Sequence, residues 1–191
     1  MQHQQNHIRI ISGRWRGRRV SFPNIQGLRP TPDRVRETLF NWLRPYIVGA
    51  NCLDLFAGSG ALSFEALSRG ASYVCAVEQN LVVGASLREA ARTLAVDEST
   101  LTLVSEEGLS WLNHKAVTPF DIVFLDPPYA LGLLPSCLQL LQEKGWLKNQ
   151  SLVYIENNAP FAPEWFPALG WQVLNAKQAG HVYYGLALRK K

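Results

Sequence analysis

The sequence has few cysteines, no lysine among its first 44 residues and no long apolar run. Its three cysteines, Cys52, Cys75 and Cys137, are odd in number and lack metal-ligand spacing, so we expect buried, reduced thiols and no bound metal. No apolar stretch approaches the roughly 20 residues that a membrane span needs, and no signal-peptide core follows Met1. These absences predict a cytoplasmic protein with no membrane partner.

Positive charge is concentrated at the N-terminus. The first 44 residues contain nine arginines and two acidic residues, a net charge of +7, whereas the remainder of the chain carries −3. Arginine forms bidentate hydrogen bonds with phosphate and stacks on bases better than lysine does, and an aromatic among arginines is typical of nucleic-acid binding. The alternative is a set of solvated arginines. The residues that we predict to contact RNA are Arg14, Trp15, Arg16, Arg18, Arg19, Arg29, Arg34 and Arg36.

A second feature is a polar motif at the end of an apolar run. Residues 120–125 have the composition of a strand buried on both faces, and the sequence Asp126, Pro127, Pro128, Tyr129 follows directly. Two prolines cannot continue the strand, and ligands of open α/β sheets bind outside the carboxyl ends of strands. A carboxylate, a stiff carbonyl and an aromatic ring can hold a planar, nitrogen-bearing base. The motif therefore indicates chemistry on an exocyclic amino group, although an ordinary strand exit remains an alternative.

A glycine-containing loop follows an earlier strand-like run. The residues concerned are Asp54, Phe56, Ala57, Gly58, Ser59 and Gly60, and the acidic Glu78, with Gln79 after it, ends the next apolar run. Glycines let the backbone approach a ligand, and a carboxylate at this distance is suited to ribose hydroxyls. The match to a dinucleotide fingerprint is poor, because its last glycine is replaced by Ser63 and Asp54 would repel a pyrophosphate. A cofactor that carries positive charge fits better.

These motifs together resemble class I S-adenosylmethionine-dependent methyltransferases. More narrowly, residues 9–19, 27–43 and 53–69 are similar to the RsmD family of bacterial 16S ribosomal RNA guanine-N2 methyltransferases. The resemblance implies S-adenosylmethionine as the cofactor and small-subunit RNA, or the assembling small ribosomal subunit, as the partner. It also implies that Asp126, Pro127, Pro128 and Tyr129 are catalytic. Related families have an Asp or Asn that contacts the adenine amino group, and this chain has Glu106 and Glu107 in that place. We expect Glu107 to make this contact; the alternative is that it lies in solvent at the start of a helix.

Strand and helix patterns alternate along most of the chain. We expect strands near 51–56, 72–77, 100–104, 120–125 and 151–156 and helices near 60–69, 80–95, 107–115 and 131–144, with an antiparallel hairpin of 171–176 and 182–188 at the end. This predicts an α/β fold: a Rossmann-like, doubly wound, seven-stranded and mostly parallel sheet. Before it we expect a disordered tail (1–7) and a basic hairpin-and-helix extension (8–48), whose helix is capped by Thr31 with Pro32 at its first position. The methyltransferase domain would then span 49–191.

Three functions remain open at this point. The preferred one is methyl transfer to the exocyclic N2 amino group of a guanine in small-subunit ribosomal RNA, by a monomeric enzyme. The second is methylation of another amino or amide nitrogen, in DNA adenine or protein glutamine. The third is RNA binding by a methyltransferase fold that has no catalytic activity. Binding of S-adenosylmethionine would exclude the third.

Overall fold

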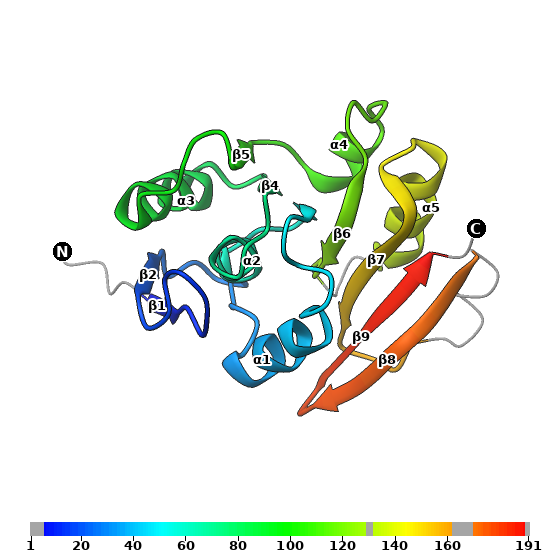
Figure 1. The fold of residues 1–191 in the computed structure, drawn as a ribbon, viewed down its shortest axis with the longest axis horizontal. Helices are drawn as coiled ribbons and strands as arrows, with labels where there is room; N and C mark the ends of the chain where they lie inside the picture. The colour runs from blue at the N-terminus through cyan, green and yellow to red at the C-terminus, as the bar shows by residue number, and fades with distance from the viewer. Residues whose placement is uncertain (1–5, 129–131, 162–169, 190–191) are drawn as a thin grey trace.

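The computed structural model describes residues 6–128, 132–161 and 170–189 of the chain (Figure 1). Its elements, in chain order, are β1 (Asn6–Arg9), β2 (Arg19–Phe22), α1 (Asp33–Trp42), β3 (Asn51–Asp54), α2 (Ala61–Ser68), β4 (Tyr73–Val77), α3 (Leu81–Leu94), β5 (Leu101–Val104), α4 (Gly108–Leu112), β6 (Phe120–Leu125), α5 (Leu134–Glu143), β7 (Leu147–Asn157), β8 (Trp171–Ala179) and β9 (Val182–Arg189).

Seven of the strands form one twisted sheet in the order β5-β4-β3-β6-β7-β9-β8. The first five lie parallel to one another, and β9 pairs antiparallel with both β7 and β8. The chain winds outward from β3 to β5 and then resumes on the other side of β3 with β6. The strand order therefore reverses between β3 and β6, which is where open α/β sheets bind their ligands. The predicted doubly wound sheet with an antiparallel C-terminal hairpin is confirmed.

Helices cover both faces of the sheet, and each face has its own apolar core (Figure 1). Buried residues of α1, α2 and α3 pack against one face around Phe124 and Tyr154. Those of α4 and α5 pack against the other face around Val123 and Val153. Because adjacent residues of a strand point to opposite faces, each central strand must be apolar throughout, which is why these strands read as continuous hydrophobic runs.

The N-terminal extension is built into the first of these cores. β1 and β2 form a separate two-stranded antiparallel sheet, and Ile8, Val20 and Phe22 are buried together with residues of α1 and α2. The loop between the two strands lies against the end of α2, since a Cβ atom on Gly13 would be 1.8 Å from the carbonyl oxygen of Ser68. Gly13 therefore permits a close approach that no other residue could make.

Element boundaries differ from the prediction at a few points. The first helix starts at Asp33, with Pro32 rather than Thr31 at the N-cap position and no side-chain cap. Thr31 is buried, and its carbonyl oxygen instead accepts a hydrogen bond from Arg36. Strand β7 begins at Leu147, because the chain after the α5 turn pairs with Phe120 before the main ladder starts at Leu152. Among the described residues, no helix is long and apolar enough to cross a membrane.

Candidate functional site

The carboxyl ends of β3, β4 and β6 meet at one edge of the sheet. Ladder registers pair Asp54 with Ala76 on one side and with Phe124 on the other, so the residues that follow these strands lie close together. Backbone hydrogen bonds extend the connection beyond the strands, from Ala57 to the carbonyl of Val77 at 2.9 Å. The glycine loop, Glu78 and Asp126 thus come from three adjacent strand ends, as the sequence predicts.

The loop after β3 depends on its two glycines. Gly58 and Gly60 have φ angles of 50° and 77°, a left-handed conformation that side chains disfavour. A Cβ atom on Gly60 would lie 2.5 Å from the ring of Phe64, and Gly60 occupies the N-cap position of α2. Ala57 and Ser59, the loop residues on either side of Gly58, are buried. The loop therefore places its backbone, rather than its side chains, toward the sheet edge, with the N-terminus of a helix behind it.

Glu78 connects this loop to the next strand end. Its Oε2 atom accepts a hydrogen bond of 3.0 Å from the N–H of Gly58, and its Oε1 atom accepts one of 2.7 Å from the N–H of Asn80. The carboxylate is half-buried, and each of its oxygens has a second lone pair for a ligand hydroxyl. Gln79, the other residue predicted here, is exposed.

Asp54 faces the protein interior. It is 2% exposed and its Oδ2 atom accepts a hydrogen bond of 2.6 Å from the hydroxyl of Ser63. Burial raises the pKa of the Asp54 carboxyl to about 6; the Ser63 hydrogen bond lowers it and the charge of Glu78 raises it further. The sequence predicted a direct contact between Asp54 and a cofactor. Its burial instead indicates an effect through charge, or through the position of Ser63 at the start of α2.

Glu107 lies beside the glycine loop but has a structural task. It is the N-cap of α4, where its carboxylate accepts hydrogen bonds from the N–H groups of Leu109 at 3.1 Å and Ser110 at 2.7 Å. Partial burial would raise the pKa of this carboxyl, but these hydrogen bonds outweigh that effect and the pKa is lowered. The ring of Phe56 packs on Gly108, where an added Cβ would be 2.9 Å from the ring. Phe56 and Glu107 thus frame one end of the site.

The Asp-Pro-Pro motif leaves β6 as expected. Asp126 is half-buried directly after the last residue of the strand, Pro127 is buried and Pro128 is exposed. Tyr129 lies outside the described residues, so its predicted stacking on a base stays a prediction. No group of His, Cys, Asp and Glu residues that could hold a metal ion occurs in the described part of the chain.

A further acidic residue stands beside this motif and was missed in the sequence. Ladder register pairs Leu125 of β6 with Ile155 of β7, so Glu156 follows at the level of Asp126. Glu156 is 1% exposed, and its Oε1 atom accepts a hydrogen bond of 2.7 Å from the hydroxyl of Tyr154. The signal was present: Glu156 follows an apolar run, as Glu78 and Asp126 do.

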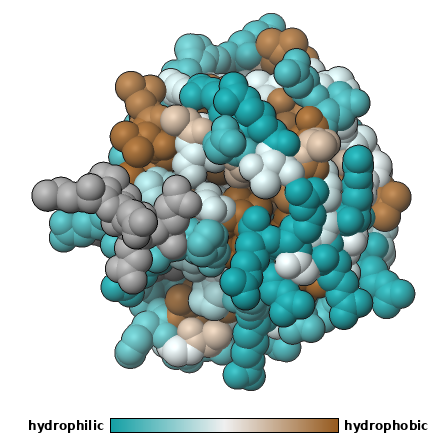
Figure 2. Space-filling model, turned by 90° about the vertical axis from the view of Figure 1, so that its left-hand side faces the viewer, coloured by the Kyte–Doolittle hydropathy of each residue, from teal (hydrophilic) through white to brown (hydrophobic). Residues whose placement is uncertain are grey.

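Most of the arginines predicted to contact RNA are exposed on the N-terminal extension. Those at the surface are Arg14, Arg16, Arg18, Arg19, Arg29 and Arg34. Figure 2 shows the side of the molecule that carries the hairpin, and hydrophilic side chains cover much of it. The guanidinium of Arg18 donates a hydrogen bond to the carbonyl oxygen of Thr93, which fixes the hairpin against α3.

The structure does not support RNA contacts by Trp15 and Arg36. Trp15 is 6% exposed and belongs to the apolar core, with the guanidinium of Arg14 over its ring at 5.5 Å. Arg36 is fully buried, and donates hydrogen bonds to Asp33 at 2.5 Å and to Glu65 at 3.5 Å. Of the two arginines predicted on this helix, Arg34 is exposed and Arg36 is not.

Tertiary structure brings the helix α3 beside the hairpin. The hydroxyl of Ser86 on α3 donates a hydrogen bond of 3.1 Å to the carbonyl of Ser21 on β2, so the helix runs beside the hairpin. Arg88 and Arg92 are exposed on this helix, where Arg88 donates a hydrogen bond of 3.1 Å to the hydroxyl of Ser105 and Arg92 pairs with Glu89 at 3.4 Å. Sequence reasoning did not select them because their separation from the hairpin along the chain hides their proximity.

Comparison with known proteins identifies close relatives. Residues 8–187 match the family model described as Conserved hypothetical protein 95. Ribosomal RNA small subunit methyltransferase D of Escherichia coli (strain K12) is 46% identical over 183 residues, which cover 96% of this chain and 90% of the relative. The protein of the same name from Haemophilus influenzae is 42% identical, and the match covers 95% of this chain and 94% of the relative.

Solved structures agree with these matches. The structure of the Escherichia coli protein yhhF has a TM-score of 0.85 and 45% identity, and the match covers 97% of this chain and 99% of that chain. A 16S rRNA N2 G1207 methyltransferase from T. thermophilus, solved with AdoMet and guanosine, has a TM-score of 0.69 at 20% identity. This match covers 98% of this chain and 50% of that chain, and it supports the fold alone.

Proposed function

This chain belongs to the RsmD family of ribosomal RNA small-subunit methyltransferases. From that membership we propose that it methylates the exocyclic N2 amino group of a guanine in small-subunit ribosomal RNA, with S-adenosylmethionine as the methyl donor. The relatives that carry this name match nearly the whole chain, including the N-terminal extension. The guanine that we propose is G966 of 16S ribosomal RNA.

The observation that carries the proposal is the meeting of Gly58, Glu78 and Asp126 at the reversal of strand order. The loop of Gly58 and Gly60 gives a methionine-bearing cofactor an approach to the backbone, and Glu78 has lone pairs for ribose hydroxyls. Asp126 lies at the end of β6, the strand next to β3 where the strand order reverses. The two halves of the site would therefore hold the donor and the acceptor on adjacent strand ends.

The chemistry needs alignment more than it needs a strong base. The cofactor supplies a methyl group on a sulfonium, which is already a good leaving group. The carboxylate of Asp126 and the carbonyl of Pro127 would accept hydrogen bonds from the two N–H groups of the guanine amino group, which would turn the nitrogen lone pair out of conjugation. The same contacts would aim the lone pair at the methyl group of the bound donor, whose carbon–sulfur bond would break with the thioether as the leaving group. The proton leaves after transfer, when the nitrogen is far more acidic, so Asp126 need not be basic.

The exposed arginines of the hairpin, Arg14, Arg16, Arg18 and Arg19, form an arginine surface that supports an RNA substrate. Hydrophilic side chains cover much of this side of the molecule (Figure 2). The loop after the hairpin reaches the glycine loop, because Cδ1 of Leu28 is 3.2 Å from the position of a Cβ on Gly58. A phosphate backbone bound to these arginines would be held by charge, without reference to sequence. The base that is methylated would then enter the site from this side.

The test is a methylation assay with S-adenosylmethionine labelled in the methyl group. Substrates are naked 16S ribosomal RNA and small ribosomal particles that lack the modification, and mass spectrometry locates the methyl group. We expect methyl transfer to N2 of one guanine, and the Asp126→Ala variant is the control. Label on adenine, on protein or on no acceptor at all would reject the proposal, as would binding of NADH in place of S-adenosylmethionine.

A further inference from the structure

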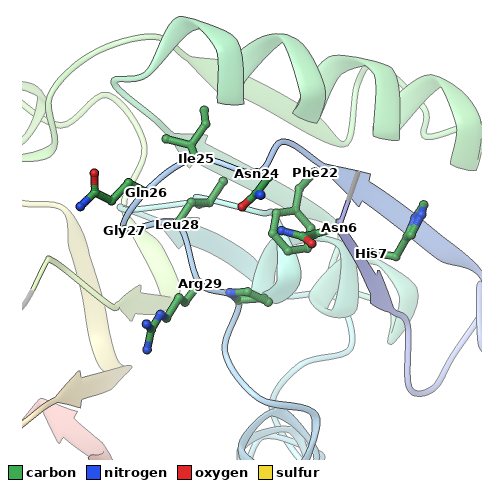
Figure 3. A pocket seen from close by; sticks show the side chains of 10 residues that line it. Asn6, His7, Phe22, Asn24, Ile25, Gln26, Gly27, Leu28 and Arg29 are labelled. Atoms are coloured by element: carbon green, nitrogen blue, oxygen red, sulfur yellow. The ribbon is translucent and has the colours of Figure 1, made fainter. Parts of the chain in front are cut away.

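A polar groove lies between the N-terminal hairpin and the loop that follows it (Figure 3). Its volume is about 530 Å³, within the range of sites that hold small molecules. The lining residues include Asn6, Asn24, Gln26 and Arg29, and none of the described residues that line the groove is acidic. Such a lining suits a ligand that offers hydrogen-bonding edges together with negative charge.

The two loop carboxamides are available to a ligand. Asn24 and Gln26 lie at the surface, and within the described residues their side chains make no hydrogen bond to the rest of the protein. Figure 3 shows both on the same loop, with Asn6 and Phe22 on the strands beside it. Asparagine and glutamine side chains can donate and accept together, which is how they read the edge of a base.

The loop that carries them is held in shape. The N–H of Leu28 donates a hydrogen bond of 3.0 Å to the carbonyl of Ile25, which closes a turn with Gln26 and Gly27 at its corner. Gly27 has a φ of 87°, as the third position of a type II turn requires. Because the turn already fixes the backbone that carries Gln26, binding has to order its side chain but not the loop as well.

The groove also adjoins the proposed catalytic centre. Leu28, which lines it, packs against the cofactor loop: its Cδ1 atom is 3.2 Å from the position of a Cβ on Gly58. The N–H of Gly58 in turn binds Glu78. A ligand in the groove therefore lies beside the methyl donor, outside the place assigned to the target base.

We propose that this groove binds an unpaired nucleotide next to the methylated guanine and reads its base through Asn24 and Gln26. Arg29 holds the adjoining phosphate. Phe22 offers no stacking face, because it is 5% exposed and belongs to the core, so recognition rests on the carboxamide hydrogen bonds. The imidazole of His7, also in the lining, is exposed and hydrogen-bonded to Ser21 at 3.1 Å. RNA-binding proteins commonly read sequence in this way, on the edges of unstacked bases. The inference rests on the proposed function, and it assigns to the groove a role in selecting which guanine is methylated.

The experiment compares the double variant Asn24→Ala, Gln26→Ala with wild type on short RNAs that contain the target guanine. Each nucleotide that flanks the guanine is changed in turn. We expect wild type to prefer one base at one flanking position by roughly tenfold or more, and the variant to lose that preference. The salt dependence of RNA binding should not change, since no charge is removed. Affinity for S-adenosylmethionine, measured by calorimetry, should also stay the same.

A matched control is the double variant Asn149→Ala, Gln172→Ala, which removes the same exposed side-chain types from β7 and β8. It should keep the wild-type preference. The inference is overturned if the groove variant retains the full preference, or if it loses affinity for S-adenosylmethionine instead. Failure of the proposed function is distinguishable, because wild type itself would then not methylate the guanine.

Discussion

The N–H of Gly58 donates a hydrogen bond of 3.0 Å to Oε2 of Glu78, so the cofactor loop of one strand is fastened by the carboxylate of the next. Glu78→Ala should therefore weaken binding of S-adenosylmethionine by roughly 1–3 kcal/mol, because it removes an acceptor from both the ribose and the loop. Isothermal titration calorimetry measures the effect. Glu78→Gln should lose less, since one oxygen acceptor remains. Unchanged affinity in the alanine variant would exclude Glu78 from the cofactor site.

Asp126 is expected to affect the chemical step rather than donor binding. Asp126→Ala should abolish methyl transfer while affinity for S-adenosylmethionine stays within about tenfold of wild type, since the carboxylate holds the amino group of the acceptor. Single-turnover methylation and calorimetry on the same preparation separate the two quantities. Full activity in this variant would end the proposed role.

Buried Asp54 predicts a specific dependence of stability on pH. The pKa of its carboxyl is about 6 in the folded protein, against 3.8 for an ordinary aspartate, so the folded state binds more protons between these values. The contribution of this group to stability is therefore greatest below about pH 4 and falls as pH rises to about 6. Asp54→Asn removes this titration. As pH rises through this window, the free energy of unfolding of the variant should therefore increase relative to that of wild type, by up to about 3 kcal/mol.

Denaturant unfolding of both proteins from pH 3.5 to pH 7 checks this prediction for Asp54. Other carboxyl groups titrate equally in the two proteins and cancel in the difference. Parallel stability curves would show that the Asp54 carboxyl does not titrate as a buried acid.

The arginine surface predicts a salt effect on RNA binding. Replacing Arg14, Arg16 and Arg19 by alanine should flatten the slope of log affinity against log salt by about 0.7–0.9 for each phosphate interaction that the substitutions remove. Arg18 is left in place because its guanidinium binds the carbonyl of Thr93. Affinity for S-adenosylmethionine should stay constant.

A charge-matched control for the arginine variant replaces Lys115, Lys144 and Lys177, which lie after α4, after α5 and on β8, far from the hairpin in Figure 1. This control should leave the slope near that of wild type. Equal slopes in all three proteins would place the RNA footprint elsewhere, with Arg29 and Arg34 as the next residues to test.

Local pattern in the sequence determined the sheet, its strand ends and the polar residues that follow them. Continuous apolar runs identify strands buried on both faces, and prolines or glycines after them fix where each strand stops. The chain alone therefore sufficed to place Asp126 and Glu78 at a common edge of the sheet. The exposed arginines were recognised in the same way, because a surplus of charge in one segment is visible in the chain itself.

Only the tertiary structure decided which polar groups are buried and what they touch. Arg36 and Glu65 are 29 residues apart in the chain, yet the guanidinium of Arg36 contacts the carboxylate of Glu65. The same carboxylate accepts hydrogen bonds from the N–H groups of Ile11 at 2.8 Å and Ser12 at 3.1 Å. This buried network fastens the hairpin to the helix that begins at the cofactor loop, and it turns an arginine of the basic segment into a structural one. Long-range contacts of this kind leave no periodic trace in the sequence, because they depend on how finished elements pack. The groove beside Leu28 and the basic side chains of α3 were hidden for the same reason.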